Sequence, residues 1–172
     1  KSHKSLLNFL RNNENRILEL GFGLGSLSQA LTKAGVLDYR ILNAIECSEH
    51  ICKYLQKYPP LPRLNVIHEE IERLHLTNLK FDLLIANRGV FQYVKPEVVR
   101  SLFQSLPSTE CKCVLITHEG SADGDVTREN NTTMFDFKSL LAGFTNKHFI
   151  QVQSEGAHLI LFAMVPRSPD RA

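Results

Sequence analysis

The sequence has no apolar run that approaches the roughly 18 residues of a membrane-spanning helix, and its start lacks the apolar core of a signal peptide. It carries 20 Lys and Arg against 18 Asp and Glu, spread along the chain without a block of one sign. Because phosphate binding needs a concentrated basic face, a nucleic-acid partner is not indicated. We expect a soluble, cytoplasmic protein that does not associate with membranes.

The four cysteines lack the spacing of a metal site or of a disulfide framework. No C-x-x-C is present, and no pair of histidines stands at the spacing of zinc ligands. Cys47 and Cys52 lie around the end of one predicted strand, and Cys111 and Cys113 open another. We interpret all four as buried or half-buried free thiols in a reducing compartment, and we predict no metal site.

Two common nucleotide-binding motifs are also absent, although a glycine-rich segment is present. Gly21, Gly23 and Gly25 form the pattern G-x-G-x-G, which is not the dinucleotide pattern G-x-G-x-x-G. No Lys-Ser or Lys-Thr pair follows these glycines, so the segment is not a phosphate loop of the G-x-x-x-x-G-K-[ST] type either.

The residues around these glycines predict a strand, a tight turn and a helix. Ile17, Leu18 and Leu20 form an apolar run typical of a buried strand, and alternating glycines let the backbone turn sharply and approach a ligand. Residues 26–34 are compatible with a helix, whose N-terminal N–H groups would point at that ligand. The alternative is a purely structural turn between a strand and a helix.

Further strands are predicted over residues 41–45, 64–68 and 81–86. The first of these ends at Glu46, which lies 46 − 25 = 21 residues beyond Gly25. An acid about 20 residues beyond such a turn, at the tip of the next strand, is placed to accept hydrogen bonds from ribose hydroxyls.

The C-terminal part continues the alternation of strands and helices. The patterns predict a helix over 96–106, a strand over 113–117, a helix over 135–141, and a hairpin formed by 149–153 and 158–165. Near-continuous apolar strands fit a sheet that is covered by helices on both faces.

Taken in order, these segments resemble the class I S-adenosylmethionine-dependent methyltransferases from about residue 17 to residue 165. Residues 19–25 resemble the first motif of that family, E/D-x-G-x-G-x-G, and residues 44–46, 68–71 and 81–91 resemble the next three. The resemblance implies an α/β fold: a three-layer Rossmann-like sandwich whose mostly parallel seven-stranded sheet ends in an antiparallel hairpin. We expect residues 1–172 to form a single domain of this kind, excised from a longer protein because the initiator methionine is missing.

The resemblance also implies S-adenosylmethionine as the cofactor. The glycines would pass beneath its amino-acid part, Glu46 would accept from its ribose hydroxyls, and Glu70 and Ile71 would meet its adenine. Phe22 is bulky for its place in the turn, so its ring either crowds the cofactor or points into the core. The residues implied in cofactor binding are Glu19, Gly21, Phe22, Gly23, Gly25, Glu46, Cys47, Glu70, Ile71 and Asn87.

Catalysis requires alignment of a nucleophile with the methyl group, exclusion of water and, for some acceptors, a base. Our candidates are Arg88, Tyr93 and His118, at the ends of the fourth and fifth strands. His118 is either a base or a polar residue that ends a strand. Arg88 either holds an anionic substrate group or is a solvated charge, and Tyr93 either shapes the pocket or packs. Other side chains expected at these strand ends are Asn87, Gln92 and Glu119.

The acceptor is not identified by the sequence, but one departure from the family narrows it. Enzymes of the family that methylate amines of bases or glutamine carry [DN]-P-P-[YF] where residues 87–90 read Asn-Arg-Gly-Val. We therefore favour a small-molecule acceptor. The long segment 119–133 is either a lid or disordered, and it lacks the distant glutamate of a calcium-binding EF-hand loop.

Three functions follow from this interpretation. The favoured one is an S-adenosylmethionine-dependent methyltransferase. The first alternative is a catalytically inactive domain of the same fold that serves as a scaffold or binds a partner. The second alternative is another enzyme of related architecture, such as a polyamine synthase or a nicotinamide dehydrogenase.

Overall fold

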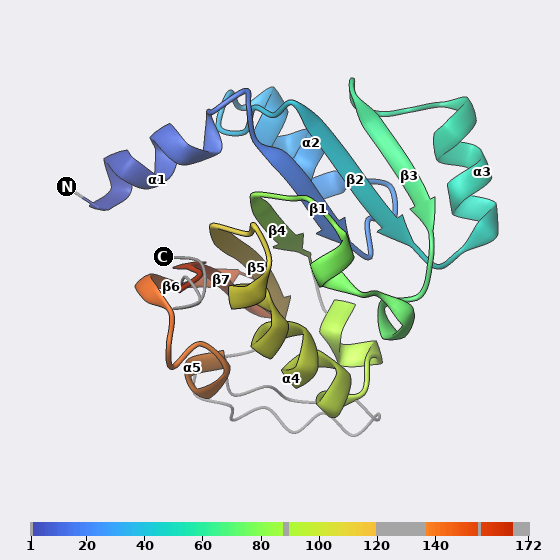
Figure 1. The fold of residues 1–172 in the computed structure, drawn as a ribbon. Coiled ribbons are helices and arrows are strands. Elements are labelled where there is room, and N and C mark those ends of the chain that lie inside the picture. Colours follow the sequence, from blue (N-terminus) through green and yellow to red (C-terminus); the bar gives the residue numbers. More distant parts are fainter. Residues whose placement is uncertain (1, 88–89, 120–136, 155, 167–172) are drawn as a thin grey trace.

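Strand β1 (Arg16–Leu20) is the third strand of a seven-stranded sheet with the order β3-β2-β1-β4-β5-β7-β6 (Figure 1). The computed structural model describes residues 2–87, 90–119, 137–154 and 156–166. The other strands are β2 (Ile41–Glu46), β3 (Leu64–His68), β4 (Leu83–Ala86), β5 (Cys113–Glu119), β6 (Thr145–Ser154) and β7 (Gly156–Met164). Strands β1 to β5 run parallel, while β7 is antiparallel to both of its neighbours, β5 and β6. This is the three-layer Rossmann-like architecture expected from the resemblance.

Helices cover both faces of the sheet because successive residues of the central strands point to opposite sides. One face packs against α1 (Ser2–Leu10), α2 (Ser26–Lys33) and α3 (Glu49–Lys57). The other face packs against α4 (Pro96–Ser105) and α5 (Phe137–Leu140), and Figure 1 shows these two helices on the opposite side of the sheet from α2. Four short 3₁₀ turns complete the described elements: η1 (Ile71–Arg73), η2 (Leu76–Asn78), η3 (Val90–Tyr93) and η4 (Leu106–Ser108).

The order of the strands reverses next to β1. From β1 the chain adds β2 and β3 on one side and then returns to place β4 and β5 on the other. Loops that leave the carboxyl ends of β1 and β4 therefore depart in opposite directions and leave a crevice between them. Ligands of open α/β sheets bind in such a crevice.

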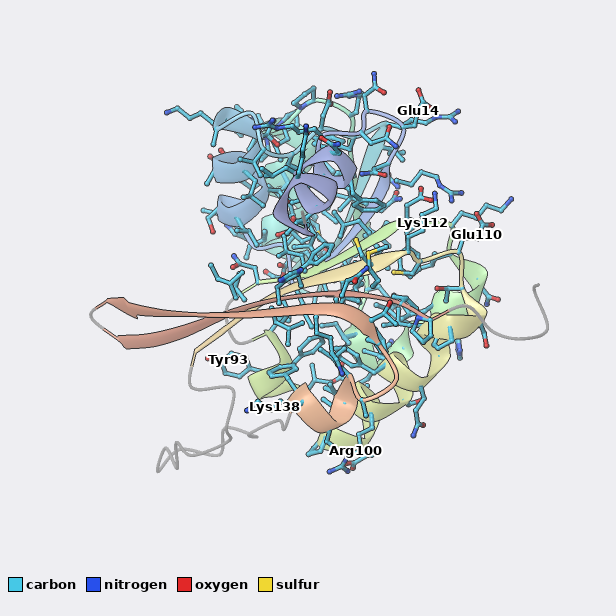
Figure 2. All side chains as sticks on the ribbon, turned by 90° about the vertical axis from the view of Figure 1, so that its left-hand side faces the viewer. Glu14, Tyr93, Arg100, Glu110, Lys112 and Lys138 are labelled. Carbon is cyan, nitrogen blue, oxygen red and sulfur yellow. The ribbon has the colours of Figure 1, made fainter. Side chains whose placement is uncertain are left out.

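The opposite end of the sheet is held together by an ion cluster around Asp82. The buried Asp82 carboxylate accepts hydrogen bonds from the Arg16 guanidinium at 2.8 and 3.2 Å, and Nζ of Lys112 lies 2.9 Å from it. These three residues begin or precede β1, β4 and β5, so the cluster aligns three neighbouring strands. Figure 2 shows Lys112 beside Glu110, on the opposite side of the molecule from Tyr93.

The observed elements match the predicted ones closely in the parallel part of the sheet. The hairpin is longer than predicted, because β6 begins at Thr145 with an irregularity before His148. Helices α1 and α3 were not among the predicted elements, although both carry apolar residues at helical spacing, such as Leu6 and Leu10 in α1 and Ile51 and Leu55 in α3. Most of the segment 119–133, interpreted above as a lid or as disordered, lies outside the described residues, as do residues 135 and 136 of the predicted helix over 135–141.

Candidate functional site

The turn after β1 needs glycine because its backbone is left-handed at three alternate positions. Gly21, Gly23 and Gly25 have φ angles of +61°, +55° and +73°, a region that residues with a Cβ rarely adopt. A Cβ at position 21 would clash with the Val90 side chain, whereas a Cβ at position 23 would meet no described atom within 4 Å. Gly23 therefore faces open space at the tip of the turn, where a ligand can come close to the backbone.

Phe22 does not block this turn. Its side chain is 3% exposed and belongs to the apolar cluster beneath α2, where its ring lies directly against Gly25. Of the two alternatives for Phe22, the structure supports the ring that points into the core. The tight contact between ring and glycine gives Gly25 a packing reason in addition to its backbone conformation.

Glu46 joins the glycine turn to the end of β2. The backbone N–H of Gly23 donates to Oε2 of Glu46 at 2.8 Å, and the N–H of Ser48 donates to Oε1 at 2.8 Å. The residue is buried, with 6% of its surface exposed. A carboxylate oxygen has two lone pairs, and Oε2 has one described donor, so it can accept a further hydrogen bond from a ligand.

A pocket of about 560 Å³ lies at the carboxyl ends of β1 and β2 and between the loops that follow β3 and β4. This volume falls in the range of small-molecule sites, roughly 300–1,000 Å³. Glu69, Glu70 and Glu72 contribute the charged groups of its described lining. The lining residues are Gly21, Ile45, Cys47, Glu69, Glu70, Ile71, Glu72, Val90, Tyr93 and Val94.

Three residues predicted to bind the cofactor line the pocket on its β2–β3 side. Glu70 is exposed, and its Oε2 lies 3.1 Å from Nε of Arg73 in an ion pair. Ile71 is buried and offers an apolar surface. Cys47 is exposed, but partial desolvation of its thiol and the nearby Glu46 carboxylate raise the pKa of this group, which keeps it protonated and unreactive at neutral pH.

Asn87, another predicted cofactor residue, lies at the end of β4 on the α2 side of the glycine turn. Its Oδ1 accepts a hydrogen bond of 2.6 Å from the Thr117 hydroxyl, and its Nδ2 lies 3.4 Å from Oγ of Ser26. The three side chains come from β4, β5 and the first residue of α2. They form a polar bridge at the same edge of the sheet as the pocket.

Glu19 was expected to contact the cofactor, but the structure places its side chain away from the pocket. Its side chain has 0% exposure and lies on the α2 face of β1, where Oε2 accepts a 2.5 Å hydrogen bond from Ser28. The pocket is on the other face, since strand residues alternate and the pocket residues pack with Leu18 and Leu20. Burial raises the pKa of Glu19 to about 7, against a smaller opposing effect of the Ser28 hydrogen bond.

The catalytic candidates are placed only in part. Tyr93 stands at the rim of the pocket with 85% of its surface exposed. His118 lies in β5 with its backbone opposite Leu159, and its side chain is outside the described part of the structure, as are those of Gln92 and Glu119. Arg88 is also outside the described residues.

Several residues of the site were not singled out from the sequence. Val90 packs on Gly21, and Val94, Glu69 and Glu72 line the pocket, although the acids directly adjoin the predicted Glu70. Ser26 and Thr117 reach the site through contacts with Asn87. For these two residues the sequence carried no signal, because a serine after a glycine turn and a threonine in a strand are common.

Other kinds of site are not apparent in the described ranges. No group of three or more His, Cys, Asp and Glu side chains gathers there as a metal site would require. Nor does any helix among the described residues have the length and apolar character to cross a membrane. All four cysteines are free, as expected; three are buried, but Cys47 is exposed, which corrects the expectation that all four are buried or half-buried.

Comparison with known proteins places these features in a family. Residues 17–108, more than half of the chain, match the family described as "Methyltransferase domain". No curated protein matches the sequence significantly.

Solved structures agree on the architecture. The N-methyltransferase NodS from Bradyrhizobium japonicum WM9, in complex with S-adenosyl-L-homocysteine, is similar with a TM-score of 0.70 and 15% identity, covering 96% of this chain and 86% of its own. The methyltransferase domain of bacterial CtHen1 has a TM-score of 0.65 and 10% identity, covering 95% of both chains. A SAM-dependent methyltransferase from Aquifex aeolicus has a TM-score of 0.62 and 16% identity, covering 96% and 89%. At these identities the likeness establishes the fold.

Proposed function

The chain belongs to the methyltransferase-domain family, and we propose that it is an S-adenosylmethionine-dependent methyltransferase that acts on a small molecule. The observation that carries this proposal is the hydrogen bond from the Gly23 N–H to Glu46. It joins the first two motifs of the family beside a pocket of suitable size, and it leaves an acceptor position on Glu46 for a sugar hydroxyl.

The residues around the pocket fit the proposed cofactor. The open space at Gly23 admits the amino-acid part against bare backbone. The buried Glu46 suits a ribose diol, and the apolar surface of Ile71 with the Glu70 carboxylate suits an adenine ring and its amino group. We therefore assign Gly21, Gly23, Gly25, Glu46, Cys47, Glu70, Ile71 and Asn87 to cofactor binding, and we assign Glu19 and Phe22 to the support of the turn from below.

When bound, S-adenosylmethionine supplies a methyl group on an electrophilic sulfonium. The chain's own contribution is to hold the reactants in line and to keep water away. We propose that Tyr93, at the exposed rim, shapes the entrance for the acceptor. We further propose that His118 accepts a proton where the acceptor carries one, and that Arg88 binds an anionic group of the acceptor. We keep the cytoplasmic location as part of the proposal, supported by the four free thiols.

Calorimetry with the full chain tests the proposal directly. We expect S-adenosylmethionine and S-adenosylhomocysteine to bind with micromolar dissociation constants. The absence of heat with both ligands would overturn the proposal. A second assay, with cofactor carrying an isotopically labelled methyl group and a panel of small acceptors, separates an enzyme from an inactive binding domain: cofactor binding without transfer to any acceptor would favour the inactive alternative.

A further inference from the structure

The side-chain amide of Asn87 is held in one orientation by residues from two other elements. The Thr117 hydroxyl lies 2.6 Å from one terminal atom of the amide, and the Ser26 hydroxyl lies 3.4 Å from the other. A separation of 2.6 Å is typical of O–H···O hydrogen bonds and is shorter than the usual range of about 2.7–3.2 Å for N–H···O bonds. The atom that faces Thr117 is therefore the carbonyl oxygen, and the NH₂ group faces Ser26.

Thr117 is well suited to this role. Its position continues the register of β5 against β4, in which Ala86 pairs with Ile116. A β-branched residue in a strand has a restricted χ1 angle, so its hydroxyl is held in place. Without that hydroxyl, the Asn87 amide could rotate by 180° and present its carbonyl oxygen to Ser26.

The orientation of the Asn87 amide matters because the N-terminus of α2 lies beside it. Ser26 is the first residue of α2, whose N-cap residue Gly25 has no side chain to cap the helix. The N-terminal N–H groups of a helix favour an anion. The NH₂ group of Asn87 adds a further donor on the same side, at the end of the glycine turn remote from Glu46.

We propose that Thr117 is a positioning residue: by holding the carbonyl of Asn87, it directs the Asn87 NH₂ group toward the carboxylate of the cofactor's amino-acid part. The inference rests on the proposed function. It adds to that function the residue that decides which end of the Asn87 amide, the NH₂ group or the oxygen, faces the ligand. Thr117 does not itself touch the cofactor.

The test compares two nucleosides that differ in this part of the ligand. S-adenosylhomocysteine carries the carboxylate, and 5′-methylthioadenosine lacks the whole amino-acid end. We expect T117V to weaken binding of S-adenosylhomocysteine by roughly 2- to 10-fold, as for the loss of one hydrogen bond between neutral groups, and to leave binding of 5′-methylthioadenosine unchanged. T117S keeps the hydroxyl and should bind both ligands like the wild type.

A second variant keeps the proposal falsifiable if T117V folds poorly. N87D retains the acceptor for Thr117 but replaces the donor with a negatively charged oxygen. It should therefore weaken the binding of S-adenosylhomocysteine by at least about 10-fold and leave the binding of 5′-methylthioadenosine unaffected. Tighter binding of S-adenosylhomocysteine by N87D would mean that Asn87 faces the ligand's ammonium group, and it would overturn the proposal.

The control is T109V, which removes a buried hydroxyl at the far end of the sheet, where Thr109 bonds to Leu106. It should lower stability without changing either affinity. Equal weakening of both ligands by T117V, or no weakening, would overturn the proposal while leaving the proposed function intact. A wild-type chain that binds neither nucleoside would overturn both.

Discussion

Ser28 on α2 donates a 2.5 Å hydrogen bond to the fully buried carboxyl group of Glu19 on β1. This contact closes the strand–turn–helix unit from beneath, on the face of the sheet away from the pocket. The second oxygen of Glu19 has no hydrogen-bond partner among the described residues. The negatively charged form of Glu19 is therefore poorly compensated, and we predict that the contribution of this residue to stability depends on pH.

Glu19 should make the folded protein less stable as the pH rises. Its pKa is raised from 4.5 to about 7 by burial, so the folded state binds this proton more tightly than the unfolded state does. The corresponding stabilisation is complete below about pH 4.5 and is lost as the pH rises through 7, by up to about 3 kcal/mol.

The variant E19Q cannot ionise and should lose this part of the pH dependence. At pH 8 it should be more stable than the wild type in urea denaturation, and at pH 4.5 it should show no such gain. E14Q, at an exposed glutamate just before β1, serves as the control and should follow the wild type. An unchanged pH profile in E19Q would show that Glu19 stays ionised in the folded protein.

Asp82 should have the opposite dependence on pH. Burial would raise its pKa, but hydrogen bonds from Arg16 and Lys112 outweigh burial and lower the pKa to about 2, from 3.8. Its contribution is complete above about pH 4 and is lost as the pH falls through 2. D82N should lower the free energy of unfolding at pH 7 by about 2–4 kcal/mol, because it removes the buried negative charge that Arg16 and Lys112 share.

Denaturant titration at pH 7 measures the effect of D82N, and the exposed ion pair of Asp38 with Arg63 provides the control. D38N should lower the free energy of unfolding by less than about 1 kcal/mol, as for other ion pairs on a protein surface. Similar losses in D82N and D38N would mean that the Asp82 cluster does not hold the three strands together.

Gly23 is predicted to be required for cofactor binding and not for packing. G23V should abolish binding of S-adenosylhomocysteine, because the new side chain would fill the open space at the tip of the turn. Gly35 offers a matched control, since it also has a left-handed backbone, with φ of +67°, and open space around its Cβ position. Calorimetry on G23V and G35V, with melting temperatures measured in parallel, separates backbone strain from loss of the site. Wild-type affinity in G23V would place the cofactor elsewhere.

Glu46 should contribute to affinity through the ribose. E46A is expected to reduce the binding free energy of S-adenosylhomocysteine by on the order of 1.5–3 kcal/mol, as for the loss of hydrogen bonds to a charged group. The control E49A removes a neighbouring glutamate that pairs with Lys53 on the surface of α3 and should leave the affinity unchanged. A dissociation constant for E46A equal to that of the wild type would remove Glu46 from the proposed ribose site.

Local sequence patterns were sufficient for most of the fold. The apolar runs of the central strands, the alternating glycines and the helix that follows them predicted β1, its turn and α2, because each pattern involves residues close together in the chain. The position of Glu46 at the end of β2 followed in the same way from the apolar run over residues 41–45. These features are set by short-range geometry, and the structure reproduces them.

Contacts between distant segments required the folded structure. The packing of Val90 on Gly21 and the bond of Thr117 to Asn87 join residues that adjacent strands bring together, the latter pair 30 positions apart. The direction of Glu19 depended on which face of β1 receives α2. A motif records the type of residue at a position, but the face toward which its side chain points is chosen by the packing of helices on the sheet.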